Sequence, residues 1–408
     1  MRGMTESLTI GERVAWYRRR RGLSQEVLAG LVGRTTDWLQ KAENNRIQLD
    51  RLSLIRALAE ALDVPVSDLL GEPTLLDWTS ESGTQTVPAL RAVLMDYSQL
   101  SPLLFTGPQH GDVIGPDELQ RQVGSIFSAY QASRFGYVTA RLPQLLKDAV
   151  SASRAHEGVD LQRVRGQLAL CYQAAASVLT KLGEADLAWV AAERGLREAE
   201  AAGDRLILGS LLRSVTHSLL STGQFIPAVS LVERASDVLR PELRSADGPL
   251  LSIYGSLFLA GAMAASRSED RATTRTFLDE AQHAADRQGT DANHLWTAFG
   301  PTNVAIHRMN TAMELGDVQV ALDLGPTLDT SGLPLERQVR HALDLARAYN
   351  LRNRSDDALA ILLDAEQIAP EQVRHHYLSR QLVLSWMRTQ RTSPTSLLAG
   401  LVDRMKLR

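Results

Sequence analysis

Four residues in the second half of the chain recur at a spacing that could build a binding surface. They follow at intervals of four, three and four, the spacing of one helical face: Trp296, Gly300, Asn303 and His307. One interpretation is an effector pocket, in which Asn303 and His307 supply hydrogen bonds and Trp296 a flat apolar wall. The other is a packed helix crossing, in which Gly300 permits close approach and Asn303 bonds a carbonyl freed by the break at Pro301. Packing is the more frequent origin of such a pattern.

No catalytic signature accompanies these residues. The sequence lacks a Gly-x-x-x-x-Gly-Lys-[Ser/Thr] phosphate loop, a His-Glu-x-x-His helix and a Gly-x-Ser-x-Gly turn. Its one cysteine, Cys171, excludes a cysteine-rich zinc site and an intrachain disulfide. The adjacent His375 and His376 would point about 100° apart on a helix, which does not suit joint metal binding. We therefore expect no enzyme activity, no metal and no cofactor.

The charge of the chain is unevenly distributed. The 408 residues carry a formal net charge of −3, yet residues 1–60 hold eleven Lys and Arg against seven Asp and Glu. This local net of +4 leaves −7 for the rest, so we expect only the N-terminal part to meet phosphate. With 44% hydrophobic and 5% aromatic residues, the composition favours a globular helical protein.

We expect this protein in the cytoplasm, with no membrane partner. No run reaches the ~18 uninterrupted apolar residues of a membrane span. Residues 1–10 have no apolar core of signal-peptide length, and a single cysteine fits a reducing compartment.

Residues 10–71 are expected to form five short helices. The predicted helices cover residues 10–21, a segment after Ser24, and then residues 36–44, 49–62 and 65–70. Ser24 and Thr35 are suited to cap the second and third helices, while Gly33 and Asn45 suit the turns that follow them. The residues expected to point inward from the second helix are Val27, Leu28 and Leu31.

This pattern resembles the phage-repressor-like (Cro/C1, or XRE) helix-turn-helix family. The matching residues are Ser24-Gln25-Glu26-Val27-Leu28-Ala29, Gly33, Thr35, Leu39 and Glu43, followed by Leu52, Leu58-Ala59-Glu60-Ala61-Leu62-Asp63-Val64 and Asp68-Leu69-Leu70. The resemblance implies a small five-helix, lambda-repressor-like DNA-binding domain over residues 1–71, with double-stranded DNA as its partner. Arg34 departs from the family, which usually has an apolar residue there, and so it either faces solvent or reaches phosphate.

In such motifs the second helix of the pair lies in the major groove. By resemblance, the candidates for base-edge contacts are Thr36, Asp37, Gln40 and Lys41. The candidates for phosphate contacts that set the register are Thr35, Asn44 and Arg46, with Arg34 as a further DNA-binding candidate. Gln25 is a candidate for either a phosphate or a base contact. Glu43 is expected to brace the fold. Residues 18–21 are four consecutive arginines, which cannot all face DNA because a helix turns between them.

Residues 72–88 lack periodicity and indicate a linker, whereas residues 89–408 predict one helix after another. A short pattern recurs in this body: Leu182-Gly183-Glu184 before Ala188, Thr222-Gly223-Gln224 before Ala228, Leu315-Gly316-Asp317 before Ala321, and weaker copies near Ala272 and Ala358. Such helix pairs resemble tetratricopeptide repeats, here longer than usual. The expected fold is therefore all-α, a small head followed by an α-solenoid of five to seven helix pairs with a concave surface.

Together these features predict a sequence-specific transcriptional regulator whose repeat domain dimerises, senses a peptide or small-molecule signal, or does both. The segment Trp296-Thr297-Ala298-Phe299-Gly300-Pro301-Thr302-Asn303 is similar to a segment of actinobacterial regulators that join such a DNA-binding domain to a repeat body. In architecture alone, the chain is similar to peptide-pheromone-responsive regulators of Gram-positive bacteria. Because one head contacts few base pairs, we expect a homodimer on paired half-sites. The candidate ligand contacts are Trp296, Asn303 and His307, with Arg308, His341 and Arg347 as further candidates. The alternative is a protein-interaction scaffold that the N-terminal domain localises to DNA.

Overall fold

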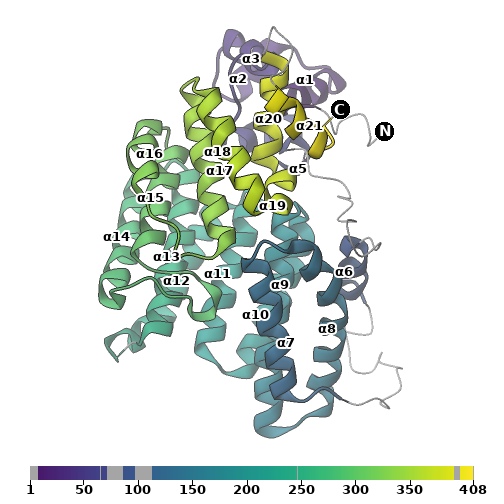
Figure 1. Cartoon of the computed structure of the whole chain (residues 1–408), viewed down its shortest axis with the longest axis vertical. Coiled ribbons are helices and arrows are strands. Elements are labelled where there is room, and N and C mark those ends of the chain that lie inside the picture. Colours follow the sequence, from purple (N-terminus) through teal and green to yellow (C-terminus); the bar gives the residue numbers. More distant parts are fainter. Residues whose placement is uncertain are drawn as a thin grey trace.

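The computed structural model describes residues 8–64, 66–70, 86–96, 113–245, 247–389 and 396–407. Every regular element in these ranges is a helix, apart from an isolated β-bridge between Ala292 and Phe299, so the predicted all-α class is confirmed. Residues 8–70 form a small head and residues 86–407 a long helical body (Figure 1). Of the predicted linker, residues 72–85 lie outside the described residues, and a helix begins at Thr86.

The head contains the five helices that the sequence predicts. They are α1 (Ile10–Arg20), α2 (Gln25–Leu31), α3 (Thr36–Glu43), α4 (Leu52–Leu62) and α5 (Val66–Leu70). The hydroxyl of Ser24 accepts a hydrogen bond from the backbone N–H of Val27 at 3.1 Å, and Thr35 accepts from Trp38 at 3.2 Å. Both predicted N-caps are thereby confirmed. Gly33 and Asn45 adopt left-handed conformations, with φ of 64° and 57°.

The core of the head is built from one narrow stripe of each helix. Leu28, Leu39 and Leu58 are fully buried in it. Two expectations for α2 are wrong, because Val27 is 49% and Leu31 62% exposed. The helix has only seven residues and meets α3 and α4 through Leu28 and Ala29, so its other apolar side chains point to solvent.

The body consists of helices of very different lengths, most of which pack against their neighbours in the chain. They are α6 (Thr86–Leu94), α7 (Pro116–Gln131), α8 (Phe135–Ala155), α9 (Gly158–Lys181), α10 (Ala185–Ala202), α11 (Arg205–Ser221), α12 (Phe225–Leu239), α13 (Gly248–Arg267), α14 (Arg271–Gln288), α15 (Pro301–Glu314), α16 (Val318–Leu324), α17 (Leu335–Leu351), α18 (Ser355–Ile368), α19 (Pro370–His375), α20 (Tyr377–Thr389) and α21 (Ser396–Arg404). In the described part of the body, three short 3₁₀ helices lie between them: η4 (Arg240–Ser245), η5 (His294–Trp296) and η6 (Gly325–Thr327).

One type of turn closes six of the helix pairs. Each turn has a residue in the left-handed conformation: Ser133, Gly183, Gly223, Glu269, Gly316 and Asn353. The N–H of the next residue donates to a carbonyl five residues earlier, at 2.8–3.1 Å, in every copy. This bond satisfies a carbonyl at the end of the first helix, as in a Schellman motif. The repeats inferred from the sequence are therefore real structural units, and the same turn also joins α7 to α8.

The structure corrects the register of one repeat. Five residues after the left-handed position stands a buried small residue in most copies, as Ala188, Ala228, Ala321 and Ala358. In the copy that follows Glu269 this place belongs to Thr274, which is buried, and not to Ala272, which is exposed. The sequence pattern placed this repeat at the nearest alanine, Ala272, but Thr274 fills the equivalent site between α13 and α14.

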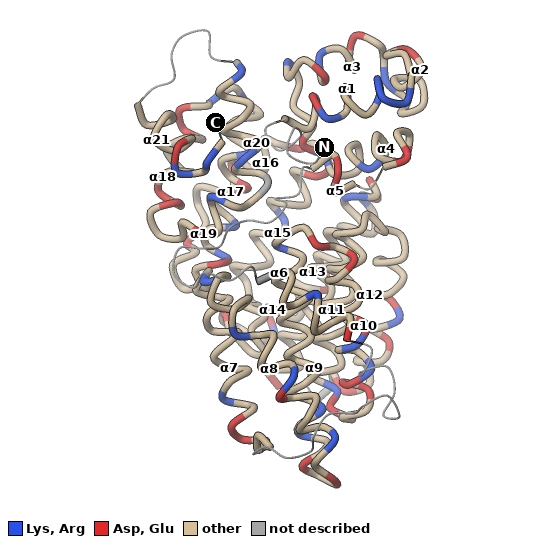
Figure 2. The backbone as a smooth tube through the Cα atoms, turned by 90° about the vertical axis from the view of Figure 1, so that its right-hand side faces the viewer, with Lys and Arg blue, Asp and Glu red and all other residues tan. Residues whose placement is uncertain are grey.

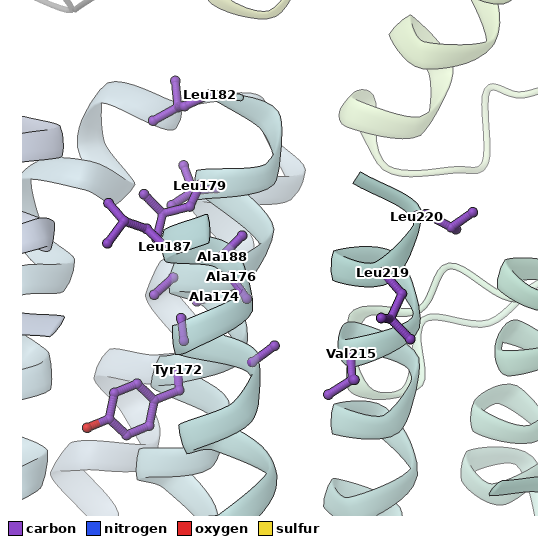
Figure 3. Close-up of a cluster of buried hydrophobic side chains, with 14 of the residues drawn as sticks. Tyr172, Ala174, Ala176, Leu179, Leu182, Leu187, Ala188, Val215, Leu219 and Leu220 are labelled. Atoms are coloured by element: carbon purple, nitrogen blue, oxygen red, sulfur yellow. The ribbon is translucent and has the colours of Figure 1, made fainter. Parts of the chain in front are cut away.

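Alanines let the two helices of a pair approach closely. Figure 3 shows this for α9 and α10, where Ala176 and Ala188 lie near Leu179 and Leu187. Within the described residues, α13 is the one helix that is long and apolar enough to cross a membrane, but most of it is buried against other helices of the body. We therefore assign α13 to the core of the body.

The head lies beside the C-terminal helices of the body (Figures 1 and 2). The backbone N–H of Ile10 donates to Gln381 of α20 at 3.1 Å, and Arg388 pairs with Glu12 at 2.5 Å. On the other side of the head, the guanidinium of Arg56 lies 5.4 Å from the ring centroid of Phe225, at the start of α12. The head thus contacts helices that are far apart along the solenoid.

Candidate nucleic-acid interface and ligand cavity

The helix α3 has one buried and one exposed face. Leu39, Ala42 and Glu43 are buried in the head. The opposite face carries the four residues predicted to meet base edges, and all four are exposed: Thr36, Asp37, Gln40 and Lys41. The contacts that hold the head to the body come from α1, α4 and the segment between α3 and α4. The polar face of α3 is therefore accessible.

Side chains on this face already have local partners. Lys41 lies 2.7 Å from Asp37, one helical turn away, and both are largely exposed. Exposed pairs of this kind contribute less than about 1 kcal/mol and weaken with salt. Asn44 donates to the main-chain oxygen of Gln40 at 2.8 Å, beyond the last turn of the helix. A phosphate or base edge could replace these contacts at small cost.

The predicted positioning residues surround this face, with one exception. Arg34, Thr35, Asn44 and Arg46 are exposed, and the guanidinium of Arg34 stacks 5.7 Å from the ring centroid of Trp38. Gln25 is half-buried, and its amide donates to Glu43 at 2.7 Å. These five predicted DNA contacts are thus not equivalent, because the side chain of Gln25 is bonded to the interior of the head.

A buried ion pair supports α3 from within. Arg18 donates through Nε and Nη2 to the two carboxylate oxygens of Glu43, at 2.5 and 2.9 Å, and through Nη1 to the carbonyl of Leu23. The hydrogen bonds that Arg18 donates to Glu43 raise the pKa of Arg18. Of the four consecutive arginines, Arg18 is therefore structural, whereas residues 19–21 are exposed. Glu43 braces the fold, as predicted.

The segment from Trp296 to His307 differs from the predicted continuous helical face. Trp296 ends the short helix η5 with a φ of 55°, and α15 begins only at Pro301, after Gly300. The Gly-Pro pair starts a helix because proline at the first helical position lacks only an N–H that would be unpaired there. Trp296 instead stacks on Phe127 of α7, with ring centroids 4.1 Å apart.

The concave side of the body encloses a cavity of about 790 Å³. Its wall includes Trp296 and His307, but not Asn303, which is 2% exposed and lies behind it. Nδ1 of His307 donates to the main-chain oxygen of Asn303 at 2.8 Å. Leu52 and Leu70 of the head also line the cavity. Two of the three predicted ligand residues thus share one cavity, which has the size of a small-molecule site.

The further candidates for ligand contacts lie outside this cavity. Arg308 is exposed on the outer side of α15, where it lies 3.9 Å from Asp279. His341 bonds the main-chain oxygen of Gly325 at 3.1 Å. Arg347 contacts Glu314 and the head. None of Arg308, His341 and Arg347 lines the cavity.

Buried histidines in and near the cavity are held neutral. Burial, together with the charges of Arg337 and Arg340, lowers the pKa of His307 to about 3. Burial and Arg213 place the pKa of His217 well below its usual value. Arg340 lies 2.7 Å from Nε2 of His376, whose pKa is lowered by burial and by that charge. Within the described residues no group of three His, Cys, Asp or Glu side chains is arranged to hold a metal ion.

The sequence did not single out the charged residues of this cavity. Arg213, Arg337 and Lys181 line it from α11, α17 and the end of α9. Burial would raise the pKa of Glu336, but the paired Lys181 and nearby Arg337 lower it to about 2. An arginine within an apolar helical stretch, as at position 213, is the one signal the sequence offers.

Comparison with known proteins agrees with this description of the head. Residues 9–70 match a family model described as a helix-turn-helix domain. No curated protein matches the chain.

Three solved structures are distantly similar to large parts of the chain. The structure of BtubC (BKLC) from P. vanneervenii is 16% identical, with a TM-score of 0.37, and the match covers 68% of this chain and 95% of that one. Bacillus thuringiensis PlcR, solved with the peptide PapR7 and DNA, is 16% identical with a TM-score of 0.34, over 69% and 95%. Aspartyl phosphate phosphatase F from Bacillus subtilis is 13% identical with a TM-score of 0.44, over 88% and 94%.

Proposed function

We propose that this chain is a sequence-specific DNA-binding transcription regulator, and not an enzyme. The observation that carries the proposal is the exposed polar face of α3 on a helix-turn-helix head. A helix presented in this way can enter the major groove, where Gln40 and Lys41 meet the donors and acceptors of base edges. Arg34 and Arg46 lie beside this face and suit phosphate contacts.

The body of the regulator serves, in this proposal, to bind a signal. A partly open, partly apolar cavity with Trp296 and His307 in its wall supports an effector of small-molecule or short-peptide size. The head contributes Leu52 and Leu70 to the same wall, so a ligand there would contact the DNA-binding domain directly. We also propose a homodimer, since one α3 can read only a few base pairs.

Selection from a pool of genomic fragments tests DNA recognition. The purified chain is expected to enrich a defined, palindromic sequence and to bind it with an affinity that falls steeply as salt rises. Replacing Lys41 by alanine should lower the slope of log affinity against log salt by about one if Lys41 contacts phosphate, or relax the sequence preference if it reads a base.

The matched control is Lys147→Ala, which removes an exposed lysine from α8, far from the head. It should leave affinity and salt slope unchanged. A chain that shows no preference among fragments would exclude sequence-specific regulation and leave a scaffold localised to DNA as the better description.

A further inference from the structure

The cavity of the body contains more positive than negative charge. Six Lys and Arg side chains line it, against three Asp and Glu. Most of the six have an acidic neighbour: Arg91 pairs with Glu184, Lys181 with Glu336 and Arg340 with Asp344, and Arg267 lies 4.0 Å from Glu314. Among the residues the structure describes, no carboxylate lies within 4.0 Å of Arg213 or Arg337. These two guanidiniums therefore carry the excess charge.

Arg213 and Arg337 belong to the same part of the cavity. Burial and the neighbouring charge of Arg337 lower the pKa of Arg213 to about 10. The Nε atom of each is buried without a hydrogen-bond partner, and Nη1 of Arg213 has only the ring of His217 at 3.4 Å. Two like charges that are half-buried near each other, neither in contact with a carboxylate of the described residues, destabilise the empty cavity. Binding an anion would remove this cost.

We propose that Arg213 and Arg337 bind the carboxylate of an amphipathic effector, whose apolar part lies against the stacked rings of Phe127 and Trp296. This inference rests on the proposed function, because it names the chemical class of the signal. A guanidinium presents a planar set of N–H donors that matches a carboxylate. The stacked rings provide an apolar wall in the same cavity.

The carboxylate of Glu336 limits how much negative charge the ligand can carry. Glu336 is ionised beside Lys181, and its negative charge interacts with the positive charges of Arg213 and Arg337. A second negative charge on the ligand would be repelled by Glu336. A monoanionic carboxylate therefore suits the site better than a phosphate dianion. Asn310, whose Oδ1 is buried without a partner on the same wall, can accept a hydrogen bond from a donor on the ligand.

Calorimetric titration of the full chain, without DNA and at constant ionic strength, tests this inference. Two acids represent the two sources of such a carboxylate: 4-phenylbutyrate for a free organic acid and the peptide Ala-Leu-Ala-Phe for a peptide C-terminus. Each is compared with its neutral analogue, 4-phenylbutanol or the C-terminal amide. At least one acid is expected to bind saturably and about tenfold more tightly than its neutral analogue. The acid that binds identifies the source.

The variants Arg213→Gln and Arg337→Gln should each weaken binding of that acid about tenfold, a loss typical of one charged contact. Their thermal unfolding temperatures should equal or exceed that of the parent chain, because repulsion is relieved, and this shows that they fold. Arg308→Gln removes an exposed arginine outside the cavity and should bind as the parent does.

Equal binding of the acids and their neutral analogues, unchanged binding by both cavity variants, or no binding of either acid at millimolar concentration would each overturn the inference. These outcomes are independent of the proposed function, since DNA recognition is measured separately. Loss of DNA preference with intact acid binding would refute the regulator and retain the anion site.

Discussion

Arg347 of α17 reaches the head at Asp50, 297 residues away in the sequence. Its Nη2 donates to the main-chain oxygen of Asp50 at 2.7 Å and lies 3.4 Å from the carboxylate. Its Nη1 donates at 3.2 Å to Glu314 of α15. Glu314 in turn lies 4.0 Å from Arg267, which lines the cavity. A continuous series of charged groups therefore joins the cavity wall to the DNA-binding head.

Replacing Arg347 by methionine should destabilise the docked head. The change leaves the carboxylate of Glu314, which is 6% exposed, without its closest cation. Removing one partner of a buried ion pair costs about 3 kcal/mol. We expect a loss of this order in the free energy of unfolding in urea, and faster amide hydrogen exchange in residues 45–56. Arg352→Met, an exposed position just after the same helix, is the control and should change neither measurement.

Glu43→Gln should lower the thermal stability of the head without changing the side chains on the exposed face of α3. The substitution removes the negative charge that faces Arg18 in the interior, where Glu43 has a side-chain exposure of 3%. An unpaired buried guanidinium again costs about 3 kcal/mol. Circular dichroism during thermal unfolding should show the head melting earlier. Glu26→Gln on the exposed side of α2 is the matched control, and an equal effect of the two substitutions would contradict the structural role of Glu43.

Two glycines should respond in opposite ways to alanine. A Cβ at Gly255 of α13 would lie 1.9 Å from the ring of Phe299, which is fully buried. Overpacking of this kind costs about 1–3 kcal/mol or more. No atom lies within 4 Å of a Cβ at Gly124 in α7, where alanine should stabilise the helix by up to about 1 kcal/mol. Urea unfolding of both variants measures the difference, and similar destabilisation by both would be inconsistent with the packing described above.

The neutral histidines should make the protein sensitive to acid. The pKa of His307 is about 3 in the folded chain, below its usual value of 6.5, so the unfolded chain binds more protons between these values. The stability that His307 contributes is complete above pH 6.5 and is lost as the pH falls toward 3. Its share of the slope is at most about 1.4 kcal/mol per pH unit.

The effect can be isolated by comparing unfolding free energies at pH 7 and pH 5. His307→Gln should show a smaller difference between the two pH values than the parent chain. His283→Gln, at an exposed position on α14, should keep the parent's difference. An unchanged pH dependence in His307→Gln would show that this side chain titrates normally.

Local signals were sufficient to predict the head and the repeated turns. Ser24, Thr35 and Gly33 act through contacts with residues a few positions away, so their roles can be read from the sequence. The repeat that contains Thr274 was placed two residues too early, since different small side chains can fill the same gap between helices.

Long-range features could not be predicted in the same way. Two such features are the contact of Arg347 with Asp50 and the proximity of Arg213 to Arg337. Both depend on the sum of many small rotations between successive helix pairs. Trp296 was expected on a helical face, but the backbone turns before Pro301 and places its ring on Phe127. The sequence contains no local signal for either arrangement.

The position of the head has a thermodynamic consequence. In an open solenoid each repeat contacts only its neighbours, so the distance between distant repeats can vary. Here the head contacts Phe225 of α12 and Gln381 of α20 at once, and it forms part of the cavity wall. A ligand that prefers one position of the head must therefore change the affinity for DNA whenever DNA also distinguishes those positions. Reciprocity then requires DNA to change the affinity for such a ligand by the same factor.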